Sequence, residues 1–257
     1  MPTVHYLQNS GFARTYLIVG GDGLMVVDVG SIGSAEDVEE YIRRTPGMDM
    51  KDVLYIASTH FHIDHIGGIG HLLNKCSPAT KVLFNYPVRD YLNGNRKISL
   101  IKNWFVGLVP ASLTSARYIR RVSHMMFETF AGIPLPGLRN IAGLPYEQDR
   151  IGYFGCEGVE RCKIGFDEWE VIATPGHTED SVSFYNGASG ELICGDLILN
   201  MKEGGCGKLN RFYCSRKMMT DSYNYLCSTI RPGIIYPGHG EIIKGDKNAL
   251  LDVKTFD

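Results

Sequence analysis

The feature that most constrains this chain is a cluster of three histidines and one aspartate between His60 and His65. It directly follows residues 53–57, an apolar run typical of a buried strand, and precedes residues 66–75, which we predict to be a helix. Loops at strand ends of α/β sheets converge on a crevice where ligands bind. The His-x-His spacing points two imidazoles to one side of an extended segment. Imidazole and carboxylate groups can bind metal ions. Asp64 and His65 begin the next turn of the chain, so they can face a second ion beside the one that the first two histidines would bind.

Three further segments place a candidate ligand after an apolar run. They are Thr174-Pro-Gly-His177, Cys194-Gly-Asp196 and Tyr236-Pro-Gly-His239. Glycine lets the backbone turn sharply and approach closely at such positions. Imidazole and carboxylate groups suit zinc, iron or manganese. Together with the 60–65 segment, these residues predict a metal site assembled from distant parts of the chain.

Apolar runs and helical periodicities alternate along most of the sequence. We predict strands over 14–19, 24–29, 53–57, 81–85, 168–174, 181–185, 191–194 and 234–236, and helices over 35–44, 66–75, 215–230 and 246–256. This alternation favours a layered α/β domain, and 257 residues fit one domain of that class, spanning 1–257. Residues 183–196 repeat the pattern of the hairpin that ends in Asp28: a strand, a glycine-containing turn, a second strand and then an aspartate, here Asp196. This repeat suggests that the domain has two similar halves.

Residues 88–150 differ from the rest of the chain in their predicted secondary structure and in their charge. We predict amphipathic helices over 91–107 and 112–130, and residues 89–150 carry nine Lys/Arg against four Asp/Glu, a net charge of +5. This helical insert could serve as a cap over the site or as a dimer element. As a cap, it would offer an apolar wall and a cation for an anionic group, from Trp104, Phe105, Met125 and Arg121. As a plain subdomain, its aromatic residues would form its own core and its charges a solvated face.

Composition excludes some classes of protein. The formal net charge is −2, which argues against a simple basic nucleic-acid binder. No apolar run approaches the length of about 20 residues that a membrane span needs. The first ten residues show no basic region followed by an apolar stretch, so we predict no signal peptide and a cytoplasmic location.

Taken together, the motifs resemble the metallo-β-lactamase superfamily, in the hydrolase branch that includes glyoxalase II-like and lactonase-like enzymes. The resemblance is carried, in family order, by His-x-His-x-Asp-His at 60–65, Thr-Pro-Gly-His-Thr at 174–178, Gly-Asp at 195–196 and Pro-Gly-His-Gly at 237–240. It covers residues 14–85 and about 165–245. It implies a four-layer αββα sandwich of two related halves, with the helical insert added to it.

The resemblance also implies a role for each candidate residue. One metal would be held by His60, His62 and His177, and the other by Asp64, His65 and His239, with Asp196 bridging the two. Asp28 and Thr178 would support these ligands without binding metal. The cofactor would be two divalent ions, with zinc the first choice and iron or manganese accepting the same ligands.

The implied activity is metal-dependent hydrolysis, in which a metal-bridging hydroxide cleaves an ester, thioester or lactone. An apolar acyl part would suit the insert, and Asp64 would act as the catalytic group that passes a proton to the leaving group. Two alternatives stay open. The same metal site could serve a phosphodiesterase or nuclease, which the charge of the insert favours, or a non-catalytic metal-binding sensor. The expected partner is a small-molecule substrate, with no membrane span, no nucleic acid, and a homodimer through the insert as an option.

Two departures from known branches leave the substrate open. Glyoxalase II-like enzymes carry a C-terminal helical domain, whereas only 18 residues follow His239 here. Lactonases of the family place a tyrosine three residues after the bridging aspartate, and this chain has Leu199 there.

Overall fold

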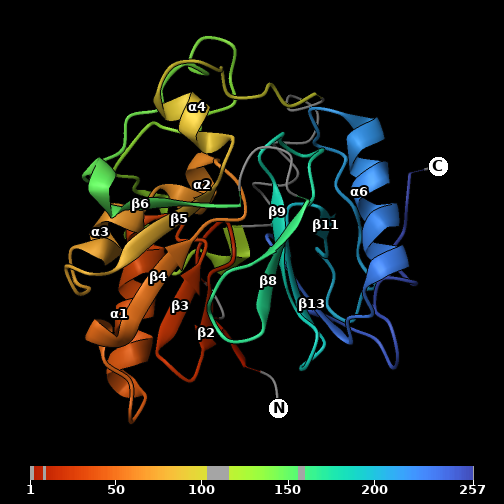
Figure 1. The fold of residues 1–257 in the computed structure, drawn as a ribbon, viewed down its shortest axis with the longest axis horizontal. Helices are drawn as coiled ribbons and strands as arrows, with labels where there is room; N and C mark the ends of the chain where they lie inside the picture. Colours follow the sequence, from red (N-terminus) through yellow and green to blue (C-terminus); the bar gives the residue numbers. More distant parts are fainter. Residues whose placement is uncertain (1–2, 8–9, 103–115, 156–159, 257) are drawn as a thin grey trace.

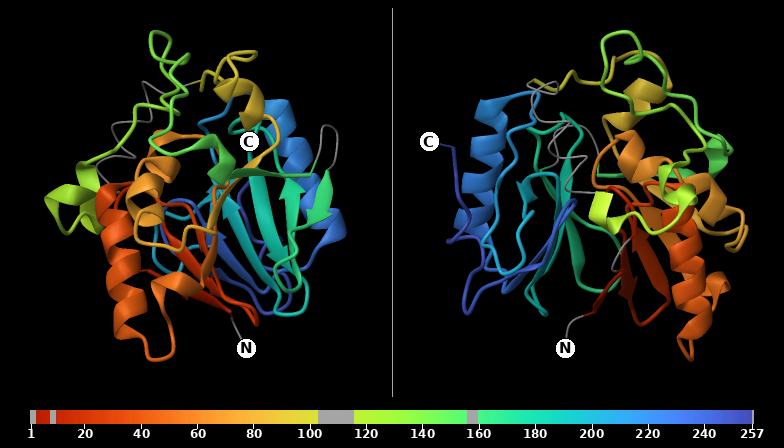
Figure 2. Two further views of the ribbon diagram at one scale, coloured as in Figure 1. Left: turned by 60° about the vertical axis from the view of Figure 1, so that its left-hand side comes forward. Right: turned by 180° about the vertical axis from the view of Figure 1, so that it is seen from behind.

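A computed structural model describes residues 3–7, 10–102, 116–155 and 160–256. Two six-stranded sheets lie face to face, with helices on both outer sides (Figure 1). Helices α1 (Ile32–Arg44) and α3 (Ile69–Leu73) cover the first sheet, and α6 (Arg216–Thr229) covers the second. The view from behind in Figure 2 shows the same order of layers. The predicted α/β sandwich of four layers is therefore confirmed.

The first sheet is built from the N-terminal half of the chain. Its strands, in spatial order, are β1 (Val4–Tyr6), β2 (Tyr16–Val19), β3 (Leu24–Val27), β4 (Val53–Ala57), β5 (Lys81–Asn85) and β6 (Ile151–Phe154). The hairpin β2–β3 is antiparallel, and β4 then pairs with β3 in parallel. Parallel pairing needs a crossover, which α1 provides.

The second sheet repeats this arrangement. Its spatial order is β14 (Ile243–Lys244), β13 (Ile234–Pro237), β10 (Glu191–Gly195), β9 (Val182–Asn186), β8 (Trp169–Ala173) and β7 (Arg161–Lys163). Here too an antiparallel hairpin, β9–β10, is followed by a parallel strand, β13, with α6 in the crossover. The two halves predicted from the repeat of the hairpin pattern are thus present. A separate small sheet pairs β11 (Ile198–Leu199) with β12 (Lys208–Leu209).

Strand β3 shows how the layers are held together. Leu24 and Val26 pack toward α1, whereas Met25 and Val27 pack between the two sheets, and all four are buried. The alternation follows from the two-residue period of a strand, and a continuous apolar run fits a strand covered on both faces. Full burial of such a side chain contributes about 1.5–3 kcal/mol. Trp169 from β8 fills the same space between the sheets.

The helices predicted for the insert do not form in its described part. Helix α4 ends at Leu92 (Val88–Leu92), residues 93–102 contain no helix, and 103–115 lie outside the described residues. From 116 to 130 only two short 3₁₀ helices occur, η2 (Ala116–Tyr118) and η3 (Val122–Met125). Beyond them the backbone bonds to other loops, because Met126 O accepts from Ile32 N and Glu128 N donates to Gly67 O. These long-range bonds take the place of a helical ladder.

Two other predicted helices need correction. The helix over 66–75 is divided into α2 (Ile63–Ile66) and α3, because Gly68 N donates to Val29 O and leaves the helical path. Residues 246–256 form turns, not a helix, and Lys254 instead exchanges backbone bonds with β12 and its neighbours, donating to Gly207 O. A third 3₁₀ helix, η4 (Gln148–Arg150), precedes β6, and η1 (Met50–Asp52) precedes β4.

Among the described residues, the longest helices, α1 and α6, have 13 and 14 residues, and none has the length and apolar character that crossing a bilayer requires.

Candidate metal centre

Four loops at one end of the two sheets bring the predicted ligands together. The loop after β4 carries residues 60–65, the loop after β8 carries His177, the turn after β10 carries Asp196, and the turn after β13 carries His239. Ligand-capable atoms of these residues lie within 4.8 Å of one another in overlapping groups of three. The seven predicted ligands therefore form one continuous cluster in space.

The first group consists of His60, His62 and His177, all buried. The His62 Nδ1 atom lies 2.9 Å from His60 Nε2 and 3.1 Å from His177 Nε2. Three ring nitrogens at such distances would repel one another as bare lone pairs. A shared cation removes that repulsion, and three imidazoles are a known set of protein ligands for a four-coordinate catalytic zinc.

The second group consists of Asp64, His65 and His239 and is more open. The side chain of Asp64 is 31% exposed and that of His239 is 15% exposed, whereas His65 is fully buried. The His239 Nε2 atom lies 3.3 Å from Asp64 Oδ2, and His65 Nε2 lies 3.9 Å from the same oxygen. This group therefore combines two imidazoles with one carboxylate that solvent can reach.

Asp196 stands between the two groups. Its Oδ2 lies 3.4 Å from His177 Nε2 and 3.5 Å from His239 Nε2, and its Oδ1 lies 3.5 Å from His65 Nε2. One carboxylate thus reaches imidazoles of both groups. A Cβ at Gly238 would lie 2.2 Å from Asp196 Oδ1, so only glycine allows this turn to pack against the carboxylate.

Four of the five rings, all except that of His62, are fixed from behind by a partner on Nδ1. His177 Nδ1 lies 2.6 Å from Phe212 O, and His239 Nδ1 lies 2.8 Å from Phe12 O. A carbonyl oxygen only accepts, so in both rings Nδ1 carries the proton and Nε2 presents its lone pair to the cluster. His65 Nδ1 lies 2.9 Å from Asp28 Oδ2, with the same consequence.

His60 follows the same rule through a hydroxyl group. Thr59 Oγ1 donates to Asp28 Oδ2 at 2.9 Å, so it accepts from His60 Nδ1 at 3.1 Å. Asp28 also accepts from Thr59 N at 2.8 Å. It supports two rings, one directly and one through Thr59, as the predicted supporting role requires. Asp28 has a φ of 60°, a strained conformation for aspartate that costs on the order of 1 kcal/mol and that these bonds help offset.

The chemistry of the cluster fits bound divalent cations. Four Nε2 lone pairs, one Nδ1 and the carboxylates of Asp64 and Asp196 converge. Within the described structure, His65 Nε2 and Asp196 Oδ1 lie 3.5 Å apart and are buried without a hydrogen-bond partner. Buried polar atoms are normally paired, so unpaired acceptors that face one another need a cation.

The two groups differ in their affinity for protons. Burial and the neighbouring His177 lower the pKa of His62 to about 3. Burial also opposes protonation of His65, but the nearby carboxylates, Asp28 foremost, outweigh it and raise its pKa to about 8. The carboxylate of Asp196 likewise raises the pKa of His239 well above the ordinary value, despite burial. The first group is therefore neutral near pH 7, and the second attracts protons or cations.

Sequence reasoning missed several supporting residues. Asp180 Oδ2 accepts from Phe61 N at 2.7 Å, between two predicted ligands. Asn210 Oδ1 accepts from Phe212 N at 2.9 Å and so fixes the residue whose carbonyl oxygen accepts from His177 Nδ1. The only sign of them in the sequence was a polar residue in a loop close to a predicted ligand, which does not by itself identify a supporting role. Thr178, predicted as a support, braces its own turn by pairing its hydroxyl with Ser181 Oγ at 2.7 Å.

Four residues are predicted for a substrate pocket, and the structure describes two of them, Met125 and Arg121. Trp104 and Phe105 lie outside the described residues. Met125 is 52% exposed. Arg121 pairs with carboxylates of α1, at 2.6 Å from Asp37 Oδ1, so it holds η3 against that helix.

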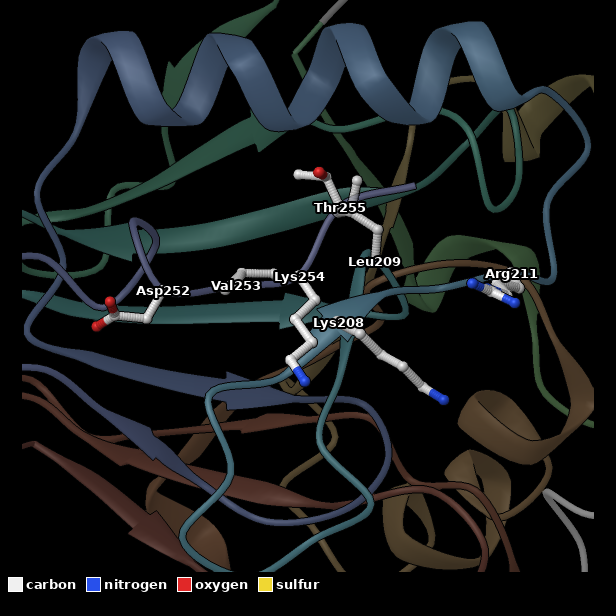
Figure 3. Close-up of a pocket in the computed structure, with 7 residues that line it drawn as sticks. All are labelled: Lys208, Leu209, Arg211, Asp252, Val253, Lys254 and Thr255. Carbon is white, nitrogen blue, oxygen red and sulfur yellow. The ribbon is translucent and has the colours of Figure 1, made fainter. Parts of the chain in front are cut away.

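A surface hollow of about 360 Å³ lies apart from these residues, between Lys208, Leu209, Arg211 and residues 252–255 (Figure 3). Its lining includes three basic side chains and one acidic side chain. None of the predicted metal ligands lines it, so it is not part of the candidate metal centre.

Comparison with known families gives a match over most of the chain. The sequence pattern of the family described as "Metallo-beta-lactamase superfamily" matches residues 10–82 and 115–257. A relative from Bacillus subtilis (strain 168), called "Probable metallo-hydrolase YqgX", is 25% identical over 248 residues, which cover 93% of this chain and 92% of the relative. A hydroxyacylglutathione hydrolase from Chromohalobacter salexigens is 26% identical over 219 residues, covering 85% of this chain but only 57% of that enzyme.

Solved structures share the fold. The protein TTHA1623, crystallised in a di-iron-bound form, has a TM-score of 0.54 and 20% identity, with 90% of this chain and 89% of that chain covered. TTHA1429 from Thermus thermophilus, described as a metallo-beta-lactamase family protein, has a TM-score of 0.57 and 18% identity, with 98% and 77% covered.

Proposed function

The chain belongs to the metallo-beta-lactamase superfamily and is a metal-dependent hydrolase, and on this premise we propose that it holds two divalent ions and cleaves an ester, thioester or lactone. The observation that carries the proposal is the convergence of the two groups on Asp196, whose oxygens lie 3.4–3.5 Å from imidazoles of both. A single carboxylate so placed suits a bridge between two ions.

Each group would hold one ion, with zinc the first choice for a histidine-rich set and iron or manganese the alternatives. When bound, a pair of such ions supplies a water of lowered pKa and a fixed positive charge for the oxygen of the cleaved bond. The protein's own contribution is to fix the rings. The Nδ1 partners described above hold the imidazoles in one tautomer, so no reorganisation is needed as charge develops.

Asp64 is the residue that we assign to proton transfer. The imidazoles of His65 and His239 hold its pKa below the ordinary value although burial opposes this, so it is ionised near pH 7. If the carboxylate turns away from its ion, it can accept the proton of the attacking water as the water oxygen bonds to the acyl carbon. The same proton then passes to the leaving oxygen or sulfur as the carbon–heteroatom bond breaks. An Asp64→Asn protein with full metal content and unchanged turnover would rule out this role.

An apolar acyl part of the substrate fits the surface that adjoins the cluster. Gly132 O accepts from Ile63 N at 3.2 Å, so the insert lies directly against the loop of the predicted ligands. Upstream of this contact, several apolar side chains of the insert remain in solvent, among them Val122, which is 72% exposed, and Phe130, which is 69% exposed. A substrate extending from the cluster along the insert would cover them.

The test is a substrate panel assayed on zinc-loaded, chelated and reloaded protein. It contains esters of short and long acyl chains, a thioester, a lactone and a phosphodiester. The proposal requires metal-dependent turnover of an acyl substrate. Turnover of the phosphodiester alone would favour the nuclease alternative, and no turnover by fully loaded protein would favour the sensor.

The acyl part is tested by a matched pair of variants. Phe130→Ser should raise KM for long-chain esters several-fold more than for short ones. Leu251→Ser is the control, because Leu251 is also 72% exposed but lies near the C-terminus. Equal effects of the two variants would contradict an acyl surface on the insert.

The remaining expectations stay predictions of the sequence. They are a cytoplasmic location, a small-molecule partner without nucleic acid, and a homodimer through residues 88–150. Gel filtration of the purified protein tests the dimer.

A further inference from the structure

The turn that carries His239 is held almost residue by residue by a segment far away in sequence. Tyr16 donates its hydroxyl to Pro237 O at 2.7 Å, and Arg14 N donates to Gly238 O at 2.8 Å. Arg14 Nε donates to Gly240 O, also at 2.8 Å. These three bonds, which we name the clamp, bracket His239 on both sides. The first sheet therefore fixes a ligand loop that belongs to the second.

Arg14 is an unusual residue for such a task. It is fully buried, and within the described structure neither of its terminal nitrogens makes a hydrogen bond. The guanidinium lies 3.3 Å from the ring centroid of Tyr118, and Nη2 lies 3.5 Å from Glu241 Oε1. A buried cation is costly, and an apolar side chain of similar volume would often be more stable. The one directed hydrogen bond of the side chain is the bond from Nε to Gly240.

We propose that Arg14 and Tyr16 are positioning residues for His239, acting through the carbonyl groups of Gly240 and Pro237 to keep its Nε2 in line with Asp64 and Asp196. This inference rests on the proposed two-ion site. According to this proposal, the clamp supports the ion held by the second group and not the ion held by the first.

The geometry explains why this loop needs such support. His239 is the sole predicted ligand of its turn, and its Nε2 lies 3.3 Å from Asp64 Oδ2 and 3.5 Å from Asp196 Oδ2. The residues of a functional site must be held within about 0.5 Å of their productive geometry. The turn also contains Gly240 with a φ of +97°, so its backbone lacks the restraint that a side chain would give.

The clamp reaches the insert as well. Tyr118, stacked on Arg14, donates its hydroxyl to Glu241 Oε1 at 2.5 Å, directly after the clamped turn. Arg117 donates to Met201 O at 3.2 Å on the neighbouring loop. The insert therefore closes over the guanidinium and keeps it dry. Exclusion of water strengthens the bond from Nε to Gly240.

The experiment compares two substitutions that remove the guanidinium equally. In Arg14→Gln the amide nitrogen stands the same number of bonds from Cα as Nε, so it can donate to Gly240 O. In Arg14→Met a side chain of similar length has no donor. Stepwise zinc affinities are measured by competition with a chromophoric chelator, for both variants and the wild type. Circular dichroism and melting curves establish that each is folded.

We expect Arg14→Met to weaken the second zinc step by about 10–100-fold, as loss of a group behind a ligand does, and to leave the first step unchanged. Arg14→Gln should restore the second step to within about threefold of the wild type. The proposal is overturned if Arg14→Met binds both ions like the wild type, if both steps weaken equally, or if Arg14→Gln is as defective as Arg14→Met.

Tyr16→Phe keeps the ring and removes only the hydroxyl bond to Pro237 O. It makes the same measurement should Arg14→Met fail to fold, with a selective loss at the second step expected and an unchanged second step contradicting the clamp. His239→Ala and His62→Ala assign the two steps. If the wild type binds one ion only, the proposed two-ion function fails. If it binds two and the clamp variants do the same, only the inference about the clamp fails.

Discussion

The two groups of the candidate centre differ in the burial of their side chains and in their affinity for protons. The first group has three buried imidazoles with lowered proton affinity, so its lone pairs are available near neutral pH. The second group has a partly exposed carboxylate and two imidazoles with raised proton affinity. A metal ion meets neutral nitrogen atoms in one group and must displace protons in the other.

The supports differ in the same way. His60 and His62 belong to one segment that Asp180 holds at Phe61 N. His239 belongs to a turn of the second sheet that depends on the clamp. The comparison teaches that two positions of similar ligand content need not be equally robust. We expect the first to bind tightly over a wide range of conditions and the second to respond to pH and to distant substitutions.

The largest effect is expected where the groups meet. Asp196→Asn removes the charge shared by His177, His65 and His239, so both ions should bind more weakly. Turnover should fall about a thousandfold, which corresponds to about 4 kcal/mol of lost transition-state stabilisation. Metal content and kcat are measured together, with Asp252→Asn at the surface hollow as control. Full activity in Asp196→Asn would break the account of a shared carboxylate.

Removal of single ligands should separate the two positions. His239→Ala should lose the second ion, keep the first and fall in turnover by about a hundredfold, because one ion would still polarise the substrate. His62→Ala should lose the first ion. Stepwise zinc affinities distinguish the two variants, and identical losses would show that the groups do not act as separate positions.

Asp28→Asn should act more mildly than loss of a ligand. The amide can no longer fix the Nδ1 proton of His65 as a carboxylate does, so zinc affinity should fall about 10–100-fold, most at the second step. Asp22→Asn, in the exposed turn before β3, is the control. A variant that matches the wild type at both steps would remove Asp28 from the supports.

The pH dependence sharpens the comparison further. Below pH 8 the metal-free His65 and His239 are both protonated, so binding of the second ion releases a proton from each ring, and its affinity should rise up to about a hundredfold per pH unit between pH 6 and 8. The pKa of His62 is about 3, so the first step should not change with pH through this ring. Titrations at several pH values check both slopes, and equal slopes would contradict the difference in proton affinity.

The sequence predicted the parts of the molecule that are locally encoded. The strands over 53–57 and 81–85, the repeat of the hairpin pattern and the candidate ligands all follow from short motifs with their own periodicity. The partners behind the ligands could not be predicted in the same way. Phe12 contributes only a carbonyl oxygen to His239, and any residue type has one.

In the insert, a local sequence pattern was present but gave a wrong prediction. Its apolar spacing favoured helices, yet in its described part the backbone of Met126 and Glu128 bonds to loops of the first sheet. Long-range pairing overrode local helix propensity, as tertiary context often does. The role of Arg14 was equally hidden, because the sequence placed it only as the first residue of the strand predicted over 14–19, whereas β2 begins at Tyr16.

The most direct test of the central claim is the number of metal ions that the folded protein binds. Purified wild type is loaded with zinc, dialysed against metal-free buffer and analysed for metal and protein. We predict two ions per chain in the wild type and one in His239→Ala. Retention of no more than one ion by the wild type, or of two by His239→Ala, would contradict the claim that these residues hold a pair of cations.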